Sequence, residues 1–150
     1  MTTSASDSTT MLSLRRILPV PREEVFSAWT QPDQLSEWFA PSDDYEKSKV
    51  EIDLRVGGSF RVHMKHKTKE TVHTVSGTYR DIRFPSKLVF TWSWKEPRDD
   101  DSVVTIELRE VKGGTELILR HERLADDSVR ADHEKGWIGC LDRLERQMHP

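Results

Sequence analysis

The sequence predicts an α+β fold, a curved seven-stranded antiparallel sheet wrapped around a long C-terminal helix. Three features of the chain lead to this expectation. Residues 47–124 carry apolar side chains at alternate positions, as in strands with one buried face. Two short helical stretches precede them, between residues 21 and 39, after a first strand. Residues 126–148 then place apolar and small residues along one helical face, and wrapping the sheet around this helix buries both surfaces.

Length, charge and cysteine content narrow the class of protein. We expect residues 1–10, rich in Ser and Thr, to be a disordered leader, and residues 11–150 to form a single domain. The net charge of -3 argues against nucleic-acid or membrane partners. No stretch approaches the ~20 apolar residues of a membrane-spanning helix, and the start does not resemble a signal peptide. Because the single cysteine, Cys140, cannot form an internal disulfide, we expect a cytoplasmic protein.

The elements before the long strand region follow from local signals. Residues 11–18, MLSLRRIL, alternate enough to predict a first strand, which stops at a Pro-Val-Pro sequence. Pro21 opens a helix with two glutamates in its first turn, where the helix dipole favours acidic side chains. A second short helix is predicted over residues 32–39, and Pro41 ends it.

Four of the predicted strands alternate clearly. Gly-Gly pairs at 57–58 and 113–114, and the sequence Phe84-Pro85-Ser86, indicate hairpin turns. The residues predicted to face inward are Phe60, Val62 and Met64; Leu88, Phe90, Trp92 and Trp94; Val104, Ile106 and Leu108; and Leu117, Leu119 and His121.

The final helix contains two glycines where leucines would pack better. Its inward arc consists of Val129, His133, Gly136, Trp137, Cys140, Leu141, Leu144 and Met148. Each glycine inside a helix costs about 1 kcal/mol relative to alanine. Gly136 on the arc and Gly139 at its edge have two compatible explanations. They let an aromatic side chain from the sheet approach the helix backbone, or they keep a hollow open between helix and sheet.

Two histidines are predicted to point toward the same interior. His121 ends an inward strand face and His133 begins the inward helix face. Histidines on apolar faces are more often hydrogen-bonded core residues than ligands or bases. A zinc site would need further donors, and the nearest candidate, His66, has no spacing that brings it close. Asp81 beside Tyr79 is better explained as a solvated charge than as a base. We therefore expect no metal, no cofactor and no catalytic residue assignable from a motif.

Five segments of the chain resemble one protein family. They are PREEVFSAWTQPDQLSEWFAP at 21–41, DLRVGGSFR at 53–61, SGTYRDIRFPSKLVFTW at 76–92, GGTELILRHERL at 113–124 and HEKGWIGCLDRL at 133–144. Together they resemble the activators of heat-shock protein 90 ATPase homologues, C-terminal-domain type, of the START/SRPBCC superfamily, which includes polyketide cyclases and birch-pollen-allergen-like proteins. The resemblance runs in order from about residue 13 to residue 147.

This resemblance implies the helix-grip fold, in which a seven-stranded antiparallel sheet grips the C-terminal helix and encloses a cavity. The positions that match cavity-lining or cavity-closing positions of the family are Trp38, Phe39, Tyr79, Trp92, His121, His133 and Trp137. With the inward-facing neighbours Phe60, Val62, Met64, Phe90 and Leu141, they form the predicted ligand-binding set. Apolar ligand pockets use such aromatic walls, and so do ordinary cores.

Three functions remain open at this point. The first is non-enzymatic binding of a small, largely apolar ligand (aromatic, lipid-like or polyketide-like), with His121, His133 and Tyr79 orienting its polar end. The second is a cyclase or dehydratase that uses either histidine with Tyr79 as acid–base groups. The third is a co-chaperone-like protein-interaction module in stress response, with a chaperone or another protein as partner. A monomer or a homodimer fits each of them.

Overall fold

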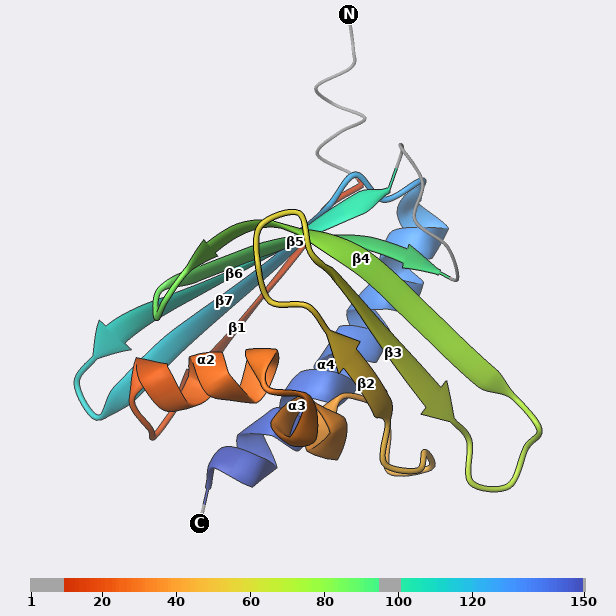
Figure 1. Cartoon of the computed structure of the whole chain (residues 1–150), viewed down its shortest axis with the longest axis horizontal. Helices are drawn as coiled ribbons and strands as arrows, with labels where there is room; N and C mark the ends of the chain where they lie inside the picture. The colour runs from red at the N-terminus through yellow and green to blue at the C-terminus, as the bar shows by residue number, and fades with distance from the viewer. Residues whose placement is uncertain (1–9, 95–100, 150) are drawn as a thin grey trace, which may run out of the picture.

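The structure, a computed structural model, describes residues 10–94 and 101–149. The predicted leader lies outside these residues apart from Thr10. Within them the chain forms a seven-stranded antiparallel sheet with strand order β1-β7-β6-β5-β4-β3-β2 (Figure 1). The strands are β1 (Leu12–Leu18), β2 (Lys49–Ile52), β3 (Ser59–Lys65), β4 (Val72–Arg83), β5 (Lys87–Trp94), β6 (Ser102–Val111) and β7 (Gly114–Glu122).

Three helices accompany the sheet: α2 (Arg22–Thr30), α3 (Pro32–Trp38) and α4 (Asp127–Met148). Helix α4 runs along the sheet, and α3 lies beside its C-terminal half (Figure 1). The carboxylate of Asp126 caps α4 by accepting a hydrogen bond from the backbone N–H of Val129. The α+β helix-grip architecture predicted from the sequence is therefore confirmed, including the two short helices after the first strand.

The alternating strand faces are confirmed almost throughout. Apart from Trp94, the predicted inward residues of β3, β5, β6 and β7 are buried; the apolar ones belong to one hydrophobic core, and His121 is buried beside it. The differences lie in β5: Thr91 and Ser93, expected on the solvent face, are buried, and Trp94, which we predicted to face inward, is 46% exposed. Trp94 is the last residue of β5, and its ring contacts His133 of α4 and Trp92 but is not covered on its other sides. Trp94 consequently lies at the edge of the core.

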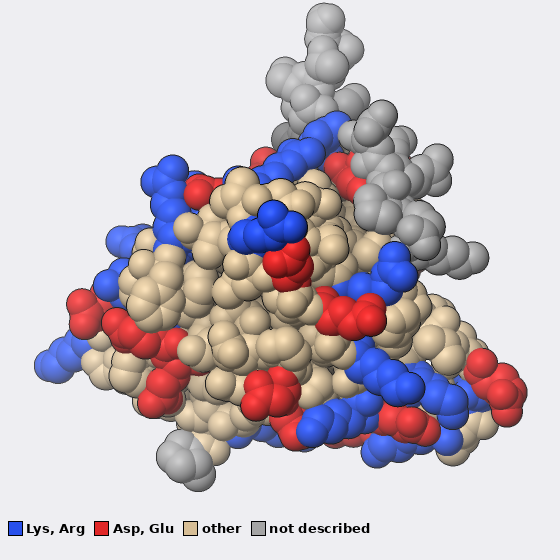
Figure 2. Space-filling model, viewed as in Figure 1, with Lys and Arg blue, Asp and Glu red and all other residues tan. Residues whose placement is uncertain are grey.

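Charged side chains of both signs are interspersed around one face of the molecule, and uncharged surface occupies its centre (Figure 2). On this face the described residues therefore form no continuous basic surface of the kind that attracts a phosphate backbone.

Candidate functional site

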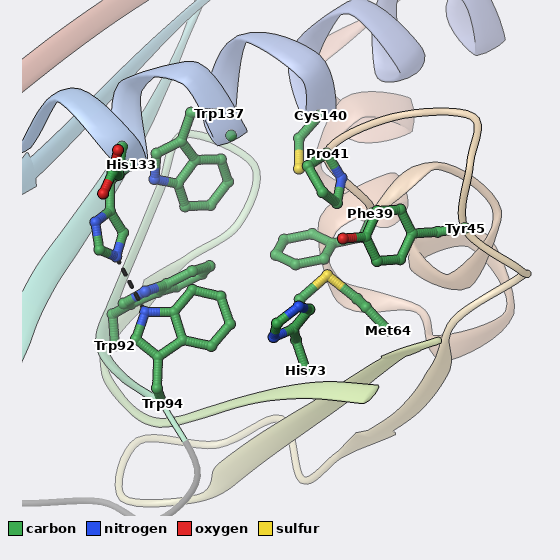
Figure 3. Close-up of a pocket in the computed structure, with 12 residues that line it drawn as sticks. Phe39, Pro41, Tyr45, Met64, His73, Trp92, Trp94, His133, Trp137 and Cys140 are labelled. Atoms are coloured by element: carbon green, nitrogen blue, oxygen red, sulfur yellow. Dashed lines mark hydrogen bonds between the residues drawn. The ribbon is translucent and has the colours of Figure 1, made fainter. Parts of the chain in front are cut away.

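A pocket of about 490 Å³ lies between α4, the segment 39–45 and the sheet (Figure 3). Its volume falls within the ~300–1,000 Å³ typical of small-molecule sites. The pocket is lined by Phe39, Pro41, Tyr45, Met64, His73, Trp92, Trp94, Asp132, His133, Gly136, Trp137 and Cys140. The pocket is thus lined by helix α4, by the irregular segment after α3 and by strands β3, β4 and β5.

The two glycines of α4 have different roles. A Cβ atom built on Gly136, which lines the pocket, would meet no other atom within 4 Å. A Cβ atom on Gly139 would lie 1.9 Å from the carbonyl oxygen of Pro41. Gly136 therefore leaves space in the pocket, whereas Gly139 lets a backbone segment approach the helix. The approaching group is the segment after α3, and not the sheet aromatic that we expected.

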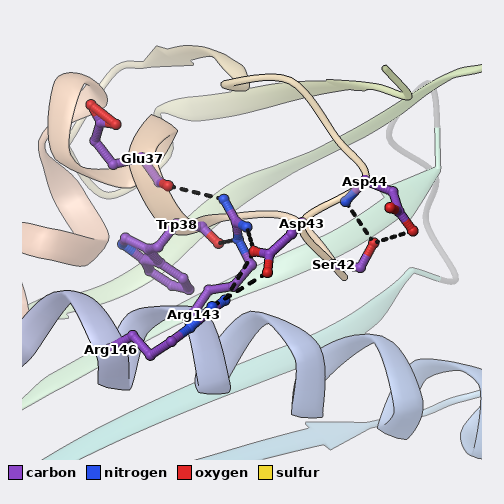
Figure 4. A network of polar contacts seen from close by, with 7 residues as sticks. All are labelled: Glu37, Trp38, Ser42, Asp43, Asp44, Arg143 and Arg146. Carbon is purple, nitrogen blue, oxygen red and sulfur yellow. Dashed lines mark hydrogen bonds and ion pairs between the residues drawn. The ribbon is translucent and has the colours of Figure 1, made fainter. Parts of the chain in front are cut away.

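Arg143 fastens this segment to α4. Its guanidinium donates hydrogen bonds to the backbone oxygens of Trp38 at 3.0 Å and Glu37 at 3.2 Å, which satisfies carbonyls at the end of α3 (Figure 4). Arg143 and Arg146 also both pair with the carboxylate of Asp43. The hydrogen bond from Arg146 is the main reason why the pKa of Asp43 lies below its usual range. The pocket wall at 39–45 is thereby held in place from the helix.

We expect Arg143→Met to lower the free energy of unfolding by about 1 kcal/mol, because two backbone carbonyls would lose a charged donor, one of them in a partly buried bond. Backbone amides after α3 should also exchange faster with deuterium. The matched control is Arg146→Met, since Arg146 contacts Asp43 at the surface and is 62% exposed; it should change stability little. Equal effects from both substitutions would contradict the role given to the two carbonyl bonds.

One wall of the pocket is a continuous aromatic surface around Trp92. The ring centroid of Trp92 lies 4.9 Å from that of Trp137, 5.6 Å from that of Trp94 and 6.1 Å from that of Phe39. These separations are those of favourable tilted and edge-to-face aromatic pairs. An apolar ligand would therefore meet large, mutually supported rings on this side.

His121 holds one of these rings from behind. It is completely buried, and its Nδ1 accepts a hydrogen bond of 3.0 Å from the indole N–H of Trp137. Because an indole nitrogen only donates, Nδ1 carries no proton. The proton is on Nε2, which lies 2.8 Å from the hydroxyl oxygen of Ser102. Burial, with a smaller contribution from His133, lowers the pKa of His121 to about 3, so the ring is neutral.

His133 holds a second ring in the same manner. Its Nε2 accepts a hydrogen bond of 3.1 Å from the indole N–H of Trp94, and its Nδ1 donates to the carbonyl oxygen of Val129 at 2.8 Å. The rings of His121 and His133 lie 5.2 Å apart, so the structure brings the two histidines together. All four of their ring nitrogens are engaged. Both histidines therefore position tryptophans in the pocket wall, and neither has a nitrogen free for a ligand.

The twelve predicted ligand-binding residues separate into three groups. Those that line the pocket are Phe39, Met64, Trp92, His133 and Trp137. A second space of about 20 Å³, close to the size of one water molecule, is lined by Phe60, Val62, Tyr79 and Phe90, with Phe39 and Trp92 at its boundary. Neither space is lined by Trp38, His121 or Leu141. Trp38 instead donates its indole N–H to the carbonyl oxygen of Ala28 at 3.0 Å.

Other candidate groups for chemistry also lie apart. Burial raises the pKa of Tyr79, whose ring packs against Phe60 and Phe90 and does not line the larger pocket. Asp81 pairs with Arg83 at 2.9 Å. Burial also raises the pKa of the Cys140 thiol to about 12, so that this residue contributes apolar lining and no thiolate.

Sequence reasoning missed Tyr45, His73, Asp132 and Pro41 as lining residues. Tyr45 and Pro41 belong to the irregular segment after α3, and His73 is near the start of β4, so no periodic pattern marks them. Asp132 lies next to the predicted inward residue His133, and that adjacency was the one available signal. Among the described residues no cluster of three or more His, Cys, Asp or Glu could hold a metal ion. The described helices include none that is long and apolar enough to cross a membrane.

A sheet that grips a long helix, with an apolar pocket between them, defines the helix-grip class of the START/SRPBCC superfamily. Within it, residues 19–149 match the family described as activator of Hsp90 ATPase homolog 1-like protein, and the chain belongs to this family. This confirms the family suggested by the sequence segments. A comparison with curated proteins found no match.

Solved structures agree with the assignment. Protein CV1439 from Chromobacterium violaceum superposes with a TM-score of 0.81 at 23% identity, covering 94% of this chain and 99% of its own. The AHSA1-like protein from Aeromonas hydrophila has a TM-score of 0.78 at 29% identity, covering 91% and 90%. PFC0360w, an Hsp90 activator from Plasmodium falciparum, has a TM-score of 0.73 at 25% identity, covering 93% and 96%. Because CV1439 is only 23% identical to this chain, its likeness shows the fold alone.

Proposed function

We propose that this protein binds a small, largely apolar molecule in the pocket between α4, the segment 39–45 and the sheet. The main support for the proposal is the pocket itself, which has a volume of about 490 Å³. On the helix side it is lined by Gly136, where a side chain would project into empty space. A helix that only needed to pack would favour alanine or leucine there, because glycine costs about 1 kcal/mol.

The rigidity of the wall supports the same proposal. Trp94 and Trp137 are each held by a hydrogen bond to a histidine, and Trp92 packs between them. A wall fixed before binding reduces the entropy that a ligand must overcome to order its site. The tryptophans therefore supply apolar contact area in a preorganised form.

Filling the hollow tests the proposal directly. We expect Gly136→Leu to weaken binding of the neutral fluorescent probe N-phenyl-1-naphthylamine at least about tenfold, a loss of about 1.4 kcal/mol. Lys135→Leu adds the same side chain at the neighbouring exposed position and should leave binding unchanged. Probe fluorescence measures affinity, and circular dichroism verifies that both variants are folded. If the wild type and Gly136→Leu bind the probe with equal affinity, the pocket is not the binding site.

A co-chaperone-like interaction in stress response is the second candidate function. Membership of the Hsp90-activator-like family and the likeness to PFC0360w favour it. Adding the protein to a heat-shock ATPase would test it, since stimulated turnover is the expected effect. The cyclase or dehydratase alternative has less support, because the ring nitrogens of His121 and His133 are engaged and Tyr79 lies outside the pocket.

A further inference from the structure

Four polar side chains of the pocket wall have no hydrogen-bond partner among the described residues: Tyr45, His73, Asp132 and Trp92, whose unpaired indole N–H is buried. Tyr45 and His73 are the two of them that could donate to a ligand from an accessible position. Tyr45 belongs to the segment that Arg143 fastens to α4, and His73 lies in β4. Both side chains point into the pocket from the side opposite Trp137 (Figure 3). Their ring neighbours are His66, 5.3 Å from Tyr45, and Trp94, 6.4 Å from His73. The phenol hydroxyl and the imidazole are therefore free to bind a ligand atom.

The described lining is poor in positive charge. It contains one carboxylate, that of Asp132, and neither lysine nor arginine. His133 cannot supply a cation without losing the hydrogen bond from Trp94, because its Nε2 would have to become a donor. A carboxylate or sulfonate bound here would find no lysine or arginine in the lining and would be repelled by the carboxylate of Asp132, which disfavours an anion. A neutral oxygen would instead receive a hydrogen bond from Tyr45 or His73.

We propose that Tyr45 and His73 are the specificity-determining residues of this pocket. They select a neutral aromatic ligand that carries a hydroxyl or carbonyl oxygen, in preference to an anion or a plain hydrocarbon of the same shape. The aromatic body lies against Trp92, Trp137 and Phe39, and the oxygen lies between Tyr45 and His73. This inference rests on the proposed binding function and adds to it the chemical class of ligand.

Three probes that share one ring system separate these possibilities: naphthalene, 2-naphthol and 2-naphthoate. The side-chain indole N–H signals in ¹H–¹⁵N spectra report binding, since Trp92, Trp94 and Trp137 line the pocket. In the wild type at pH 7 we expect 2-naphthol to bind at least about fivefold more tightly than either other probe.

Substitutions then assign the preference to residues. Tyr45→Phe should weaken 2-naphthol binding about three- to tenfold and leave naphthalene binding unchanged, as expected for one lost neutral hydrogen bond. Combined with His73→Phe, it should bring 2-naphthol to the affinity of naphthalene. Tyr79→Phe makes the same chemical change at a buried tyrosine outside this pocket and serves as the control; it should keep the preference.

Each contrary result has a distinct meaning. If 2-naphthoate binds as tightly as 2-naphthol, or if Tyr45→Phe weakens naphthalene as much as 2-naphthol, the selectivity proposal is overturned while ligand binding stands. If none of the probes shifts an indole signal, the binding function is overturned together with the selectivity.

Discussion

Gly139→Ala is expected to lower the free energy of unfolding by about 3 kcal/mol, the upper part of the range for overpacking. An added Cβ would lie 1.9 Å from the carbonyl oxygen and 2.8 Å from the carbonyl carbon of Pro41. Both are backbone atoms of a segment that Arg143 ties to α4, so no side chain can rotate away. Helix and segment must separate, and this outweighs the ~1 kcal/mol that alanine gains in helix propensity.

Thermal unfolding measures this effect, and for a chain of this size we expect the Tm to fall by roughly 6–12 °C. Gly136→Ala is the matched control three residues away on the same helix. Its added Cβ meets nothing within 4 Å, so it should raise stability by up to about 1 kcal/mol. If both substitutions shift the Tm in the same direction, the close approach of Pro41 is not what requires glycine at position 139.

Much of the fold could be predicted because its elements have strong local signals. Alternation separated the buried faces of β3, β5, β6 and β7, and the glycines at 57 and 113, each with positive φ, lie in the predicted turns. Trp94 differed because burial at a strand end depends on what covers that end. Alternation specifies the side of the sheet on which a side chain lies, but not how completely the elements on that side cover it.

The pocket could be predicted only in part, for a physical reason. Residues such as Met64 and Trp137 line it from regular elements, whose periodicity shows which way they face. Tyr45 lines it from an irregular segment whose position is set by the approach to Gly139 and by hydrogen bonds from Arg143, about a hundred residues later in the chain. Such long-range constraints leave no periodic trace in the sequence.

The histidines illustrate the same limit at the level of single atoms. Their inward direction follows from strand and helix periodicity, and the structure places the two rings 5.2 Å apart. Their hydrogen-bond partners, the indoles of Trp94 and Trp137, decide whether they can serve a ligand, and no spacing encodes those partners. Two groups expected to orient a ligand are for that reason better described as supports for the aromatic wall.

His121 should also make the stability of the protein depend on pH. Its pKa is about 3 in the folded state, because the buried ring is desolvated and His133 is close, against 6.5 when it is exposed to water. Above pH 6.5 the ring is neutral in both states and its contribution is fully present. Between pH 6.5 and about 3 the unfolded chain binds a proton that the folded protein does not. The free energy of unfolding should therefore fall by up to about 1.4 kcal/mol for each pH unit of acidification.

Urea unfolding from pH 7.5 to 4.5 would measure this dependence in the wild type and two variants. His121→Asn keeps an acceptor for the indole N–H of Trp137 but has no ionisable ring, so its stability should be lower at pH 7.5 and should fall less steeply with acid. Ser102→Ala removes the hydroxyl that lies 2.8 Å from His121 and leaves the ring in place. It should reduce stability by about 1 kcal/mol at pH 7.5 and retain the wild-type slope. If His121→Asn loses stability with acid as steeply as the wild type, the acid sensitivity belongs to other groups. If the free energy of unfolding is independent of pH in His121→Asn alone, the acid sensitivity of the wild type is due to the buried imidazole of His121, which stays unprotonated in the folded state.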